Sequence, residues 1–110
     1  MDRFLAGETI NIGTGLTVVA PGVGYRSLST VKTYSMKGQT TSGVGSVTVQ
    51  VQGSMDNIVW DVTLIGTITL TLGPATVSDG FTSTDRYKYV RMNVSALTGA
   101  GAAVTGTIGY

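Results

Sequence analysis

The sequence contains neither cysteine nor histidine. Without cysteine it can form no disulfide and no thiolate metal site. Without histidine it lacks the commonest general base and metal ligand, and a serine–histidine–aspartate triad is impossible. A serine–lysine pair with Lys32 or Lys37 remains conceivable, although nothing in the sequence marks either lysine as buried. We therefore expect no enzyme activity, no bound metal and no cofactor.

Charge is also scarce, since 12% of the residues are charged and the formal net charge is +1. Such a surface has no strong field to attract nucleic acid or an anionic membrane, and neither is expected as a partner. Two interpretations stay open: surface hidden in an assembly, or a surface made polar by threonine and serine. No apolar run reaches the ~20 residues of a membrane helix. The first residues, MDRFLAGETI, do not resemble a signal peptide, so synthesis in the cytoplasm is expected.

The composition points to β-structure. Sixteen glycines accompany abundant threonine and valine, which is typical of strands joined by tight turns. No window shows helical spacing of apolar residues. The period-two pattern predicts seven or eight strands of unequal length with several bulges, and hence an all-β, jelly-roll-like antiparallel β-sandwich. The expected strands lie at residues 8–12, 16–20, 29–37, 46–52, 58–72, 75–81, 86–94 and 103–110.

Two of these strands carry irregularities. In 29–37, the apolar residues Val31, Tyr34 and Met36 do not share one simple register, which predicts a bulge. The segment 58–72 is long for one strand, and Gly66 interrupts it, so a bend or bulge is expected there.

The first 28 residues differ from the rest in having five glycines, one proline and no long alternating run. We expect residues 1–28 to form an extended N-terminal arm, and residues 29–110 to form the body of a single domain. An ordinary first hairpin at residues 1–28 is the alternative.

The segment QGSMDNIVWDV, residues 52–62, holds the only tryptophan. Trp60 is in phase with apolar neighbours two and four residues away, which predicts a strand whose inward face carries Trp60 as the core tryptophan of a hairpin. The polar residues before it have the chemistry of a tight turn. The alternative is an exposed sugar-binding platform that combines Trp60 with Tyr89 and Tyr87.

A resemblance to a known family rests on two segments of the sequence, "VTVQVQGSMDNIVWDVTLIGTITLTLG" and "DGFTSTDRYKYVRMNVSALTGAGAAVTGTIGY". Over residues 46–110 the chain resembles small virion structural proteins of tailed bacteriophages, closest to jelly-roll capsid decoration proteins, also called cement or staple proteins. The resemblance implies a virion protein made in the host cytoplasm. Such a protein binds the outside of the capsid shell and clamps neighbouring capsid subunits. Its partners would be the major capsid protein and its own copies, as a dimer or trimer.

Under this resemblance, the expected capsid contacts are Arg3, Phe4 and Leu5, because apolar side chains beside a terminus need a surface to cover them. The alternative function is a carbohydrate- or receptor-binding module of a phage tail or head fibre. A tail-tube or head-completion protein is a third possibility, but such proteins carry long charged loops that this chain lacks.

Overall fold

The computed structural model describes residues 4–5, 10–16, 20–21, 24–27 and 30–109, with side chains from residue 24 onward. Within these ranges the chain forms ten β-strands and no helix. The strands are β1 (Phe4–Leu5), β2 (Ile10–Leu16), β3 (Ala20–Pro21), β4 (Tyr25–Ser27), β5 (Val31–Gln39), β6 (Ser42–Ser54), β7 (Gly66–Leu72), β8 (Val77–Thr84), β9 (Tyr89–Ala100) and β10 (Ala103–Gly109).

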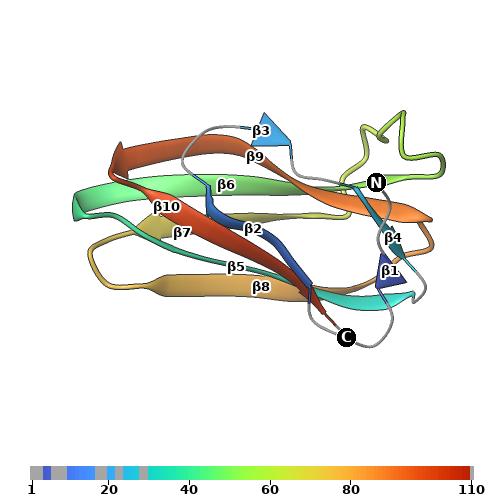
Figure 1. The fold of residues 1–110 in the computed structure, drawn as a ribbon, viewed down its shortest axis with the longest axis horizontal. Helices are drawn as coiled ribbons and strands as arrows, with labels where there is room; N and C mark the ends of the chain where they lie inside the picture. Colours follow the sequence, from blue (N-terminus) through green and yellow to red (C-terminus); the bar gives the residue numbers. More distant parts are fainter. Residues whose placement is uncertain (1–3, 6–9, 17–19, 22–23, 28–29, 110) are drawn as a thin grey trace.

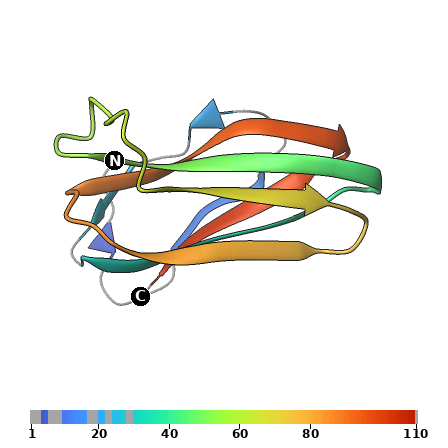
Figure 2. The ribbon, with the colours of Figure 1, turned by 180° about the vertical axis from the view of Figure 1, so that it is seen from behind.

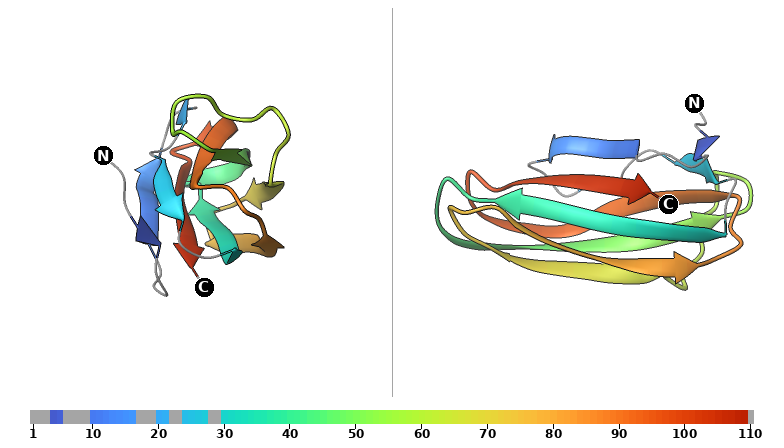
Figure 3. Two further views of the ribbon diagram at one scale, coloured as in Figure 1. Left: turned by 90° about the vertical axis from the view of Figure 1, so that its right-hand side faces the viewer. Right: turned by 90° about the horizontal axis from the view of Figure 1, so that it is seen from below.

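The strands form two sheets that lie against each other (Figures 1 and 3). One sheet has the order β1-β4-β9-β6-β7, with β3 also paired to β9. The other has the order β2-β10-β5-β8. Every pair is antiparallel except β1 with β4. The all-β sandwich predicted from the sequence is confirmed.

The pairing of eight of these strands is nested. β2 pairs with β10, β4 with β9, β5 with β8, and β6 with β7. The first strand of the set thus meets the last, and so on inward to the central hairpin. A long antiparallel hairpin rolled into two four-stranded sheets gives this order, which is the jelly-roll topology.

The core lies between the inward faces of the two sheets. Valines alternate with polar residues along β6, so that one face of the strand is fully buried while the other carries threonine and glutamine. The same alternation holds along β9 and β10, as predicted. The buried apolar residues of these strands are Val47, Val49, Val51, Val90, Met92, Val94, Val104 and Ile108. Tyr110, expected to share the inward face of the last strand, lies outside the described residues.

The bulge predicted within 29–37 was wrong. β5 pairs with β8 and β10 in unbroken register, and its inward residues alternate strictly. The misleading assumption was that Val31 faces inward. Val31 is 49% exposed, and the inward position beside it belongs to the fully buried Lys32.

The described parts of residues 1–28 are extended, as expected of an arm, yet they are paired with the body. β2 forms the edge of one sheet along β10, and β4 adds to the other along β9. The two sheets therefore extend across the boundary placed at residue 29.

The strand predicted at 58–72 is wrong over its first half. β7 begins only at Gly66, opposite Val51, and residues 55–65 form a loop. Trp60 is consequently only half-buried and is not one of the buried core residues, which corrects its predicted role as the core tryptophan. Gly66 starts the strand rather than bending it, and the ring of Phe81 packs where a side chain at residue 66 would lie.

Candidate binding loop at one end of the sandwich

The loop 55–65, which we call the tip loop, connects β6 to β7 and extends beyond one end of the sandwich (Figures 1 and 2). The connector between β8 and β9 lies at the same end. Four large apolar side chains of the tip loop are exposed: Met55 (55%), Ile58 (80%), Val59 (67%) and Val62 (97%). The exposed large apolar residues described elsewhere, Val31 and Val44, lie singly in strands, so this loop concentrates apolar surface at one point.

Two polar side chains brace the first half of the tip loop. The buried hydroxyl of Ser54 donates to the Val59 carbonyl at 2.6 Å and accepts from the amides of Asp56 and Asn57 at 3.2 and 3.0 Å. The carboxylate of Asp56 accepts from the amides of Ile58 and Val59, both at 2.9 Å. Side chains that capture local amides offer the backbone an alternative to a strand ladder. This explains why the loop replaces the predicted strand.

The same bonds change the titration of Asp56. Hydrogen bonds from the amides of Val59 and then Ile58 lower the pKa of this carboxyl below its ordinary value of 3.8. Asn57 takes a positive φ of 61°, a conformation that asparagine tolerates better than most residues. The Asp56–Asn57 turn therefore has a defined shape at neutral pH.

The second half of the loop is anchored through the backbone and Trp60. The amide of Asp61 donates to the Gly53 carbonyl at 2.9 Å. The guanidinium of Arg91 lies 4.3 Å from the centroid of the Trp60 ring, and its Nε donates to Gln52 Oε1 at 2.7 Å. Trp60 thus holds the loop against the outer face of β9 and β6. A cation–π contact of this kind stabilises by about 0.5–2 kcal/mol, depending on burial.

The surroundings of Trp60 are close-packed on a second side. A Cβ atom at Gly24 would lie 2.9 Å from Cζ2 of the Trp60 ring and would also overlap the Asn57 side chain. Residue 24 immediately precedes β4 in the chain. The tip loop is therefore packed against a segment from the first quarter of the sequence as well as against β9.

Tyr87, in the connector between β8 and β9, packs at the root of the tip loop. Its ring occupies the space that a side chain at Gly53 would need. A hydrogen bond to the Asp61 carboxylate raises the pKa of Tyr87 above its ordinary value. Met55, Asp61, Arg86 and Tyr87 line a shallow pocket of about 350 Å³ beside the exposed apolar side chains. The pocket combines apolar walls with one carboxylate and one guanidinium.

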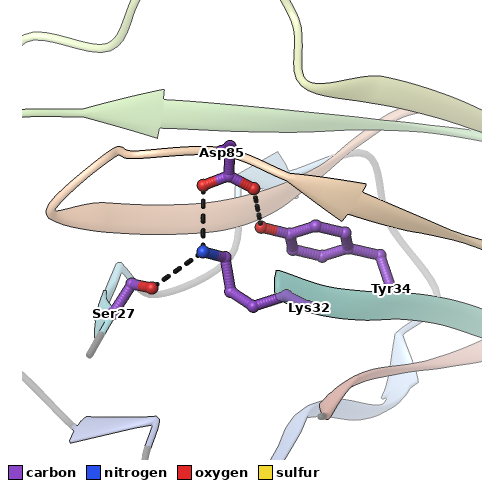
Figure 4. A network of polar contacts seen from close by, with 4 residues as sticks. All are labelled: Ser27, Lys32, Tyr34 and Asp85. Carbon is purple, nitrogen blue, oxygen red and sulfur yellow. Dashed lines mark hydrogen bonds and ion pairs between the residues drawn. The ribbon is translucent and has the colours of Figure 1, made fainter. Parts of the chain in front are cut away.

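A buried polar network fixes the start of this connector (Figure 4). Lys32 Nζ lies 3.0 Å from Asp85 Oδ1 and donates to Ser27 Oγ at 2.9 Å. Tyr34 donates its hydroxyl to Asp85 Oδ2 at 3.0 Å, and the Asp85 amide donates to the Thr30 carbonyl at 2.8 Å. Burial, followed by the charge of Asp85, raises the pKa of Tyr34 well above its ordinary 10.0. The network ties Asp85, and with it the next residues of the connector, to β4 and β5.

The network contains a contact between Ser27 and Lys32, one of the two lysines for which the sequence left a serine–lysine pair conceivable. A general base must be a neutral amine, whereas the ammonium of Lys32 is here the counterion of Asp85. The arrangement is that of a structural ion pair. Lys37, the other lysine considered, is exposed on the outer face of β5.

Only two of the three capsid-contact residues expected from the sequence, Phe4 and Leu5, lie within the described residues. Arg3 lies outside the described residues. Phe4 and Leu5 form β1, whose backbone pairs in parallel with Arg26 and Ser27 of β4. In the described ranges, no group of three or more acidic, histidine or cysteine side chains could hold a metal ion. Within the same ranges, no helix could serve as a membrane span.

Sequence reasoning missed the exposure of Ile58, Val59 and Val62 because it placed them in a strand, and it left Met55 in the tight turn before that strand. Two features of the sequence did indicate a loop. The predicted strand of residues 58–72 exceeded the usual strand length. The serine, aspartate and asparagine just before it form the combination that most readily captures backbone amides.

Comparison with protein-family models, curated protein sequences and solved structures found no match to this chain.

Proposed function

We propose that this chain is a structural virion protein, a decoration protein that binds the outside of a tailed-phage capsid and clamps neighbouring capsid subunits. The observation that carries the proposal is the braced tip loop, which presents four exposed apolar side chains from one end of a jelly roll. The resemblance of residues 46–110 to such proteins supports the choice of partner.

A braced loop suits a binding role. Fully burying one valine, isoleucine or methionine side chain stabilises a complex by roughly 1.5–3 kcal/mol. Association costs less when the contact residues are already ordered, and the hydrogen bonds of Ser54 and Asp56 order this loop before it meets a partner. Modest contacts of this size become strong when many copies bind one shell through several contacts each.

Stabilisation of a shell requires no chemistry. A ligand that binds only the assembled shell shifts the assembly equilibrium toward that shell. The paired state of Lys32 and Asp85 fits this non-catalytic role, because it uses the buried charged groups for structure.

The alternative of a glycan-binding module rests on Trp60 as a stacking platform. One face of the Trp60 ring is covered by Arg91, and the ring also packs beside Gly24. A sugar would have to displace the guanidinium from that face. The geometry therefore favours the decoration protein over the glycan-binding module.

The test is to purify mature virions of the encoding phage on a density gradient and to count copies of this chain per particle. Hundreds of copies on the shell are expected. A count of a few copies, or a chain that stays with tails or fibres, would contradict the proposal. Titration of the free protein with glycans gives a second readout, in which the emission of Trp60 should not change.

A further inference from the structure

The end of the molecule that carries the tip loop combines apolar side chains with positive charge. Among the described residues, and besides the internally paired Lys32 and Asp85, the charged groups near the tip loop and the start of β9 are Arg26, Arg86, Lys88, Arg91, Asp56 and Asp61. Cations thus outnumber carboxylates there. The two carboxylates are also engaged locally, Asp56 with backbone amides and Asp61 with Tyr87.

Arg86 is the cation best placed to meet a partner. It is exposed, and it lines the shallow pocket together with Met55, Asp61 and Tyr87. The planar guanidinium of arginine binds a carboxylate through two parallel hydrogen bonds, which favours a partner carboxylate at this pocket. The buried position of Asp85, one residue earlier, holds the backbone from which Arg86 projects.

The size of the surface argues against a second copy of this chain as the occupant. A standard stable interface uses roughly 20–30 residues on each side. Four exposed apolar side chains and one pocket supply far fewer. A surface this small gives lasting attachment when several copies are linked in one unit and each meets its own site on a repetitive array, because linked contacts add.

The carboxylates of the tip loop argue against a lipid surface. Asp56 and Asp61 lie between the exposed apolar residues in the sequence, so insertion of the loop would bring both toward the headgroups. The apolar interior of the bilayer would exclude both carboxylates. A protein socket can accommodate apolar side chains while leaving carboxylates at its edge in water.

We propose that the tip loop seats in an apolar socket on the partner protein, with a partner carboxylate at the rim bound by Arg86. This inference rests on the proposed function, since it describes how the chain would attach to a capsid subunit. Met55, Ile58, Val59 and Val62 fill the socket, and the braced turn at Asp56 and Asn57 presents them.

The experiment uses capsid shells assembled without this chain and measures occupancy by co-sedimentation over a range of protein concentrations. Ile58→Ser with Val62→Ser removes apolar contact, and Arg86→Glu reverses the rim charge. The matched controls are Val44→Ser, a valine 78% exposed at the far end of β6, and Lys37→Glu on the outer face of β5. Circular dichroism and urea unfolding establish that each variant is folded.

Both tip variants are expected to bind at least about tenfold more weakly than wild type, while both controls bind as wild type does. The loss caused by Arg86→Glu should shrink as the salt concentration rises, because salt screens exposed charge pairs. Arg86→Lys should bind with intermediate strength, because lysine keeps the charge but not the paired geometry.

The other possible results separate a failure of the proposed socket from a failure of the proposed decoration role. If wild type occupies shells and the tip variants bind equally well, the socket is overturned while the decoration role stands. If wild type fails to bind shells, both are overturned. Tip-dependent binding to phosphatidylserine–phosphatidylcholine vesicles, or tip-dependent dimers in sedimentation equilibrium, would replace the protein socket with a membrane or a second copy.

Discussion

The Nζ atom of Lys32 lies 3.0 Å from Oδ1 of Asp85, and both side chains are shielded from water inside the sandwich, at 0% and 8% exposure. Lys32 comes from β5, and Asp85 directly follows β8, the strand that pairs with β5. The ion pair therefore joins an inner strand of one sheet to the connector that crosses into the other. That connector supplies Arg86 and Tyr87 to the pocket beside the tip loop.

Removal of Asp85 should destabilise the fold strongly. Asp85→Ala leaves the buried ammonium of Lys32 without its counterion, and we expect a loss of about 3–5 kcal/mol in the free energy of unfolding. Urea denaturation measures the loss. Asp79→Ala, which removes an exposed carboxylate from β8, should change stability by less than about 0.5 kcal/mol.

The double variant Lys32→Met with Asp85→Leu tests whether the unpaired charge causes that loss. Replacing a buried ion pair by apolar residues of similar size is often neutral. The double variant should therefore be more stable than Asp85→Ala alone by about 2 kcal/mol or more. Equal instability of the two variants would show that packing, rather than the unpaired ammonium, dominates.

Tyr34→Phe should cost less than the loss of Asp85. The substitution keeps the ring, which lies 5.4 Å from that of Phe81, but removes the hydroxyl that donates to Asp85 Oδ2. An unsatisfied buried acceptor costs about 1–3 kcal/mol. Thermal and urea unfolding should agree on a loss in this range, and a neutral result would contradict the hydrogen bond.

The tip loop should loosen in acid. The pKa of Asp56 is lower in the folded chain than its ordinary 3.8, so the bonds to Ile58 and Val59 stabilise the folded loop above that value. This stabilisation declines as the pH falls below 3.8 and is lost as the pH passes through the lowered folded-state pKa. An NMR titration of the Asp56 carboxyl should give a midpoint below 3.8.

The variant Asp56→Ala supplies the control for that titration. It should show weakened protection of the Ile58 and Val59 amides against hydrogen exchange already at neutral pH, whereas Asp79→Ala should not. A midpoint at or above the ordinary value for Asp56 would refute the bracing role of its carboxylate.

Trp60 should report the state of the loop by fluorescence, since it is the only tryptophan. Arg91→Ala removes the cation that lies 4.3 Å from the ring centroid. We expect emission shifted to longer wavelength and faster quenching by acrylamide, with a stability loss of about 0.5–2 kcal/mol. The control is Lys88→Ala, which removes an exposed cation just before β9 and should leave the emission of Trp60 unchanged.

Much of the fold could be predicted from local patterns. The alternation of valine with polar residues in β6, and of apolar with polar residues in β9 and β10, identified the inward faces correctly. In a sandwich each such strand buries one face, so a period of two is sufficient to mark it. The unequal strand lengths also pointed to the jelly roll that the nested pairing forms.

The exceptions to the pattern depend on partners distant in the sequence. Lys32 faces inward only because Asp85, fifty-three positions later, supplies its counterion. The tip loop leaves the ladder because its amides bind Ser54 and Asp56, and Trp60 meets Arg91 rather than the core. Hydrophobic periodicity depends only on neighbouring positions in the sequence, so it cannot reveal contacts between residues that are distant in the chain.

The sequence by itself therefore determined the class of fold, the inward faces of the regular strands and the absence of cysteine and histidine chemistry. Only the tertiary structure decided that a lysine occupies the core, that the tryptophan lies half-buried outside it, and that apolar surface gathers at one end. The physical reason is that side-chain alternation is a local property, whereas the cost of burying a charge or exposing an apolar group depends on what the rest of the fold brings alongside.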